Sequence, residues 1–176
     1  MNPSTRRHRA SAGGFTLIDL MVTVAIVAIM ATVLLPRLQD QGRLRLIAGS
    51  RLLSSDIEMA QIMTISNPAE PIVVKFEPTL GIYWLASAAD PGTPILRPGA
   101  GQLYRVKFGE GRGRTARDVT FALTGVAPDD ILSFNERGGM TDPTVQPQIT
   151  LMHGSRWITL SISTTTGSIT ETYGGG

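Results

Sequence analysis

The sequence contains no cysteine and only two histidines, and both facts restrict the chemistry open to it. Without cysteine there is no disulfide framework, no thiolate nucleophile and no cysteine metal site. One histidine, His8, lies in the basic N-terminal stretch, and the other, His153, lies in a predicted turn, so the two cannot form a zinc cluster together. His153 also has no designated acid partner, and we expect it to be a solvated turn residue. We therefore expect no catalytic residue, no cofactor and no metal site, and we predict that the protein is not an enzyme.

Acidic residues are missing from the first 14 residues, which we interpret as a leader. The leader holds the three arginines Arg6, Arg7 and Arg9, so the chain after Gly14 has one basic residue fewer than acidic residues. This balance argues against a globally basic nucleic-acid-binding protein, although the formal charge of the whole chain is +2. A secretory signal peptide is excluded as well, because its cleavage site would follow the apolar region instead of preceding it.

One long apolar run, from Phe15 to Leu35, follows the leader. At 1.5 Å per residue it would form about 30 Å of helix, which matches the hydrocarbon thickness of a bilayer. Few helices in a protein core are apolar on every face over such a length, so the run predicts a transmembrane helix, with a buried core helix as the alternative. Asp19 is the one carboxylate in the run, and we expect it to pair with a cation, because an unpaired charge there is costly.

The segment Gly14-Phe15-Thr16-Leu17-Ile18-Asp19-Leu20, followed by an apolar helix, resembles the class III signal of type IV pilins and type II secretion pseudopilins. The resemblance implies that an inner-membrane prepilin peptidase cuts between Gly14 and Phe15 and N-methylates Phe15. It also implies that Asp19 receives the amine of a neighbouring subunit during assembly, although the usual acid of the family is glutamate. A leader in the cytoplasm and a C-terminal domain in the bacterial periplasm, carried by a single-pass inner-membrane helix, are further expectations from this resemblance.

Pro36 ends the apolar run, and a proline inside a helix bends its axis. Helical periodicity then resumes up to Ser66, with an apolar stripe that includes Leu46 and Leu53, and with Asp56 among the polar positions elsewhere. The pattern predicts one helix from about Thr16 to Ser66, kinked near Pro36. The predicted domains are a cleaved leader (1–14), a transmembrane or fibre-core helix (15–35), its amphipathic continuation (36–66) and a β-rich periplasmic domain (67–176).

Strand periodicity begins after Pro71. Two hairpins are predicted, one from 72–76 and 82–85 and the other from 148–152 and 156–162. Further strands are predicted at 102–108, 118–123, 131–134 and 168–173, while the proline- and glycine-rich segment 86–101 is predicted to be a loop. The fold class is therefore α+β, with the long helix packed on an antiparallel β-sheet or β-sandwich domain. This arrangement is similar to the H-type minor pseudopilins and the FimT-like minor pilins.

The segment 109–117 carries Arg112, Arg114 and Arg117 on a glycine-rich backbone. Arginines in such a loop can grip phosphates, and FimT-like pilins that take up DNA have a Gly-Arg-x-Arg motif near the C-terminus. Here the motif is in mid-chain beside Glu110, so a solvated loop is the favoured interpretation and nucleic acid is not expected as a partner.

We therefore predict a minor pseudopilin, an assembly subunit of the type II secretion pseudopilus that helps to export folded proteins across the outer membrane. The expected partners are other pseudopilins or minor pilins, the prepilin peptidase and the inner membrane. The alternative is a minor pilin of a type IV pilus, including one with a role in DNA uptake.

Overall fold

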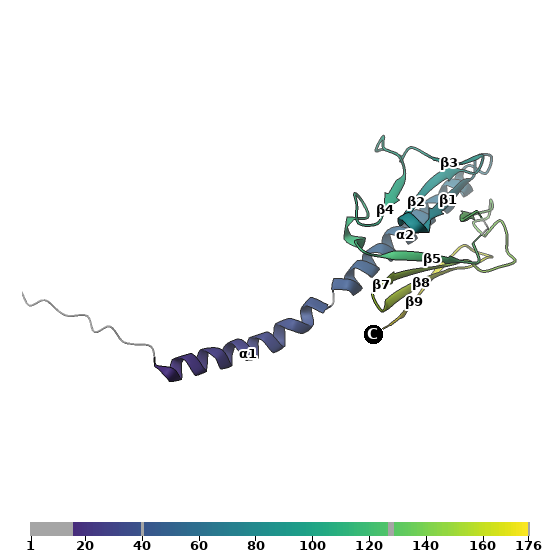
Figure 1. Cartoon of the computed structure of the whole chain (residues 1–176). Helices are drawn as coiled ribbons and strands as arrows, with labels where there is room; N and C mark the ends of the chain where they lie inside the picture. The colour runs from purple at the N-terminus through teal and green to yellow at the C-terminus, as the bar shows by residue number, and fades with distance from the viewer. Residues whose placement is uncertain (1–15, 40, 127–128, 176) are drawn as a thin grey trace, which may run out of the picture. The chain divides into compact units, whose positions relative to one another are not determined.

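The computed structural model describes residues 16–39, 41–126 and 129–175. The chain divides into two compact units, Met1–Asp40 and Gln41–Gly176, and each is described here by itself (Figure 1). The predicted cleavage site between Gly14 and Phe15 lies outside the described residues.

The first unit contains the helix α1, Leu17–Gln39. Thr16 and Asp19 start it as a reciprocal cap: the Thr16 backbone N–H and hydroxyl donate to the Asp19 carboxylate, and the Asp19 N–H donates to the Thr16 hydroxyl. Among the described residues no helix is long and apolar enough to cross a membrane, so the predicted transmembrane first half is wrong.

The prediction of a single helix kinked at Pro36 is also wrong, because the chain forms two helices. The second helix, α2, is Gln41–Ser66, and the residue between the two, Asp40, lies outside the described residues. Pro36 lies inside α1, and helical structure continues after it to Gln39.

Helix α2 packs one face against both sheets of the second unit. Its buried positions recur every three or four residues, which is the spacing that brings side chains onto one helical face. They are Leu46, Gly49, Ser50, Leu53, Asp56, Ile57, Ala60 and Thr64. Thr64 joins the helix to the first strand, because its hydroxyl accepts the Ile72 N–H at 3.0 Å inside the core.

The first sheet is antiparallel and has the order β3-β2-β1-β6, with β4 also paired to β2. Its strands are β1 (Ile72–Glu77), β2 (Ile82–Ser87), β3 (Asp90–Pro94), β4 (Arg105–Lys107) and β6 (Ile131–Ser133). The short 3₁₀ helix η1, Pro78–Leu80, connects β1 to β2. The prediction of a loop over 86–101 missed β3, an edge strand in which Pro91 and Pro94 are tolerated because an edge leaves backbone groups without a ladder partner.

The second sheet is antiparallel with the order β5-β7-β8-β9. Its strands are β5 (Thr120–Thr124), β7 (Gln148–His153), β8 (Arg156–Ile162) and β9 (Ile169–Gly174). The 148–162 hairpin forms with His153 opposite Arg156 around Gly154, whose φ of 61° suits a glycine. The core lies between the sheets and α2, where four rings pack with centroids 5.7–6.1 Å apart: Phe76, Tyr83, Phe108 and Phe121.

Candidate functional site

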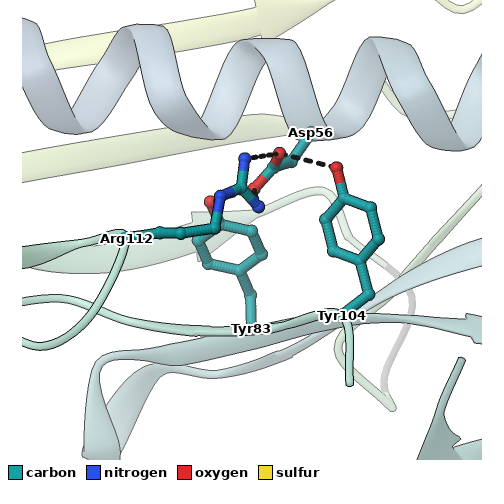
Figure 2. Close-up of polar contacts among 4 residues, drawn as sticks. All are labelled: Asp56, Tyr83, Tyr104 and Arg112. Atoms are coloured by element: carbon teal, nitrogen blue, oxygen red, sulfur yellow. Dashed lines mark hydrogen bonds and ion pairs between the residues drawn. The ribbon is translucent and has the colours of Figure 1, made fainter. Parts of the chain in front are cut away.

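The most concentrated polar arrangement of the second unit surrounds Asp56, on the buried face of α2 (Figure 2). Asp56 has no exposed surface, and its carboxylate accepts hydrogen bonds from the hydroxyls of Tyr83 at 2.8 Å and Tyr104 at 2.9 Å. The guanidinium of Arg112 donates to both carboxylate oxygens, at 2.9 and 3.2 Å. We call these four residues the Asp56 cluster. It joins α2 to three other segments of the chain, since Tyr83 lies in β2, Tyr104 precedes β4, and Arg112 lies in the loop after β4.

The loop that carries Arg112 is shaped by a close backbone approach at Gly113. The Gly113 N–H donates to the Glu110 carbonyl at 2.8 Å, and the Gly109 N–H donates to the Gly113 carbonyl at 2.9 Å. A Cβ at Gly113 would lie 2.3 Å from the Lys107 carbonyl oxygen, so only glycine fits there. The glycine-rich composition that suggested a flexible loop thus permits a tight turn that places Arg112 against Asp56.

The hydrogen bonds and the ion pair of the Asp56 cluster offset the free-energy cost of burying the Asp56 carboxylate. An isolated buried charge is strongly unfavourable, whereas a paired and fully hydrogen-bonded one is tolerated. The Arg112 side chain is 31% exposed and also lies over the Tyr104 ring, with its Cζ 5.3 Å from the centroid. Burial first, and the neighbouring Asp56 second, raise the pKa of Tyr83 well above its ordinary value. Because Asp56 is buried and its donors all belong to the chain, the geometry suits a structural lock rather than a general base.

We expect the stability of this unit to fall at alkaline pH. The pKa values of Tyr83 and Tyr104 are raised in the folded state by burial and by Asp56, while an unfolded tyrosine titrates near about 10. Their contribution is therefore complete below about pH 10 and is lost as the pH rises through that value toward the folded pKa values. Thermal unfolding between pH 8 and 11.5 should show this loss, and Tyr83→Phe should reduce the slope.

The matched control is Tyr173→Phe. Tyr173 is the third tyrosine of the chain, it is exposed, and its hydroxyl donates to the carboxylate of Glu171. This hydrogen bond also raises the pKa of Tyr173, but solvent screens an exposed pair, so its contribution to stability is small. Its replacement should leave most of the alkaline slope in place. An unchanged slope in Tyr83→Phe would contradict the role assigned to this hydroxyl.

The structure separates the three arginines that the sequence grouped together. Arg112 is engaged with Asp56, whereas Arg114 and Arg117 are exposed at the start of the 3₁₀ helix η2 (Arg114–Ala116) and just after it. An open pocket of about 390 Å³ lies against Arg112, and Arg105, Lys107 and Glu110 line it as well. Lys107 pairs with Glu110 at 2.5 Å. The cluster of three bases proposed for phosphate binding is therefore reduced to two on this loop.

Asp19 and His153, which the sequence analysis also singled out, each lie next to a polar side chain. The Asp19 carboxylate caps α1, and hydrogen bonds from the Thr16 backbone and hydroxyl hold its pKa below the ordinary value. His153 is half-buried instead of solvated, with its Nε2 3.5 Å from Arg45, which pairs with Asp118 at 2.8 Å. Within the described residues, no group of three or more histidine, aspartate or glutamate side chains could hold a metal ion.

Sequence reasoning missed the Asp56 cluster because it counted Asp56 among the solvent-facing polar positions of the helix. A signal was present: Asp56 lies three residues after Leu53 and four before Ala60, which places it inside the apolar stripe. A carboxylate in such a stripe requires buried donors. Nothing in the sequence, however, indicated which tyrosines and which arginine would supply them.

Comparisons with protein-family models, with curated protein sequences and with solved structures return no match to this chain.

Proposed function

We propose that the protein is a minor pseudopilin, an assembly subunit of a type II secretion pseudopilus. The observation that carries this proposal is α1, whose large apolar side chains between Leu17 and Met30 are 47–74% exposed on all sides of the helix. A monomeric protein rarely exposes so much contiguous apolar surface, and such surfaces mark interaction sites. Helices of neighbouring subunits are the partner that fits a helix apolar on every side.

In this proposal α1 packs with equivalent helices in the core of a short fibre. Association is driven by side-chain packing along the helices, and Asp19 contributes to the correct register by receiving the amine of a processed neighbour. The second unit presents its surfaces to other minor subunits or to exported proteins. Processing by a prepilin peptidase at the inner membrane, and a periplasmic position for the second unit, belong to the same proposal.

A minor subunit of a type IV pilus would assemble by the same helix packing. The feature that pointed to DNA uptake was the cluster of Arg112, Arg114 and Arg117, and the engagement of Arg112 with Asp56 weakens it. No other feature of the described residues favours that alternative.

The test is incorporation of the full chain into a fibre. The chain is co-expressed with the pseudopilins and prepilin peptidase of a reconstituted secretion system, and surface fibres are sheared off and probed for it. We expect a processed chain that begins with N-methyl-Phe15 in the sheared fraction. A processed chain that stays entirely with the cells would contradict the proposal, as would an intact mass showing an uncut chain.

Replacing Asp19 should separate its two roles. Glutamine at this position keeps the capping arrangement with Thr16 but has no charge, whereas glutamate keeps both. If Asp19 pairs with a neighbour's amine, Asp19→Gln and Asp19→Ala should both be processed but should be depleted from sheared fibres at least about tenfold, with Asp19→Glu near wild type. Normal incorporation of Asp19→Gln would show that capping, and not pairing, is what Asp19 supplies.

A further inference from the structure

The outward face of the second sheet has an unusual composition. Side chains alternate along each strand, and the inward set is apolar and buried, as for Phe121, Leu151 and Leu160. The outward set, which we call the hydroxyl face, consists of Thr120, Ala122, Thr124, Gln148, Thr150, Met152, Trp157, Thr159, Ser161, Thr170, Thr172 and Gly174. None of these residues is charged, although charged residues make up about 25% of a typical soluble domain.

Strand pairing arranges the hydroxyl face into rows across the four strands, which Figure 1 shows side by side. The first row is Thr124, Gln148, Ser161 and Thr170, and the second is Ala122, Thr150, Thr159 and Thr172. The third row is Thr120, Met152, Trp157 and Gly174. Neighbours in a row are about 4.8 Å apart, as strands of a sheet are. The face therefore has two rows of mostly hydroxyl and amide groups beside one row with an indole.

Trp157 lies down on the sheet instead of standing away from it. A Cβ at Gly174, the residue directly opposite on β9, would lie 2.2 Å from Cζ2 and 2.4 Å from Cε2 of the indole. The benzene part of the ring therefore covers Gly174, which a side chain at that position would prevent. The residue remains 37% exposed, so the ring has one side on the backbone of β9 and the other toward solvent.

We propose that the hydroxyl face binds a neutral polysaccharide. The apolar C–H face of a sugar ring stacks on an aromatic plane, and the open side of Trp157 offers such a plane. The equatorial hydroxyls of the polysaccharide both donate and accept hydrogen bonds, and so do the threonine and serine hydroxyls of the first and second rows. Thr150 and Thr159 already share a 2.9 Å hydrogen bond across the strands, which orients this pair within the second row.

The absence of charged side chains on the hydroxyl face indicates which class of polymer it can bind. Nucleic acids and anionic polysaccharides require lysine or arginine, and no position of the hydroxyl face carries either. A second copy stacked face to face would need apolar side chains from both sheets to interdigitate. Here only Met152, Trp157 and Ala122 are apolar, and a paired face would bury rows of hydroxyls. The hydroxyls of a neutral polysaccharide can form hydrogen bonds with the polar side chains of both the first and the second row.

The experiment measures oligosaccharide binding by the full chain in a mild detergent without a sugar headgroup. Trp84→Phe leaves Trp157 as the only tryptophan, since the chain has two, and its fluorescence then reports on the hydroxyl face alone. The probes are cellohexaose and chitohexaose, with polygalacturonate as the anionic comparison. Binding is confirmed by titration calorimetry on the unmodified chain.

We expect saturable binding of at least one neutral probe and a change in Trp157 fluorescence. Trp157→Ala should raise the Kd at least about tenfold, which corresponds to 1.4 kcal/mol. Thr172→Val keeps a β-branched side chain but removes one hydroxyl, and it should raise the Kd about threefold. The matched control is Thr165→Val, which removes an exposed hydroxyl from the turn before β9 and should change nothing. Thr172→Val keeps the proposal testable if Trp157→Ala does not fold.

Three results would overturn the proposal. The first is the absence of binding by either neutral probe at millimolar concentration, and the second is binding that survives both Trp157→Ala and Thr172→Val. The third is a dimer that depends on Trp157, seen by sedimentation, in a chain with no sugar affinity. The proposal does not depend on fibre assembly, because the isolated chain is tested, and its failure leaves the fibre experiment unaffected.

Discussion

Replacing Asp56 with alanine is expected to lower the free energy of unfolding of the second unit by about 3 kcal/mol. The substitution leaves the buried Tyr83 hydroxyl without its acceptor and leaves the Arg112 guanidinium without its anion. It also removes the link between α2 and the segments that carry Tyr104 and Arg112. We place the loss at the lower end for a broken buried pair, because the Arg112 side chain is 31% exposed and solvent can partly replace its partner.

The measurement is thermal and denaturant unfolding of the full chain followed by tryptophan fluorescence. Trp84 lies in β2 and Trp157 in β8, so each sheet has its own probe. Glu58→Ala is the matched control: it removes an exposed carboxylate from the same helix and should change stability by less than about 0.5 kcal/mol. If Asp56→Ala were no more destabilising than Glu58→Ala, the cluster would not be the lock that its geometry indicates.

The strands were predictable wherever alternation alone determines structure. In β7 and β8 the apolar positions 149, 151, 158, 160 and 162 alternate with mostly polar ones around Gly154, and one register buries all five. Strand β3 was not predictable on that basis, because Asp90-Pro91-Gly92-Thr93-Pro94 has no alternation and reads as a turn. Its pairing to the edge of β2 is set by tertiary contacts, and a local pattern does not contain them.

The Asp56 cluster shows a second limit of local reasoning. The position of Asp56 on α2 could be read from helical spacing, but its partners lie 27, 48 and 56 residues further along the chain. The glycines on either side of Arg112 predict a flexible loop with a solvated arginine, because glycine usually indicates flexibility. At Gly113 the reason for glycine is instead steric, and only the position of the Lys107 carbonyl reveals it.

Gly113→Ala is therefore expected to destabilise the second unit by about 2 kcal/mol, the cost of overpacking a site that cannot relax. Its Cβ would lie 2.3 Å from the Lys107 oxygen and 3.1 Å from the Phe108 Cα, and both are backbone atoms that cannot rotate away. Moving the loop to relieve this clash withdraws Arg112 from Asp56, so part of the loss has the same origin as in Asp56→Ala. The two substitutions combined should then cost less than the sum of their separate effects.

Gly111→Ala provides the comparison within the same loop. Gly111 has a φ of 49°, but no atom lies within 4 Å of its Cβ position, so alanine there meets only the backbone strain of about 1 kcal/mol. Limited trypsin digestion with mass analysis gives a local readout, because a withdrawn Arg112 is open to cleavage after it. Gly113→Ala should be cut there faster than both the wild type and Gly111→Ala. Equal unfolding free energies and equal cleavage rates in the two variants would mean that the Lys107 contact does not position Arg112.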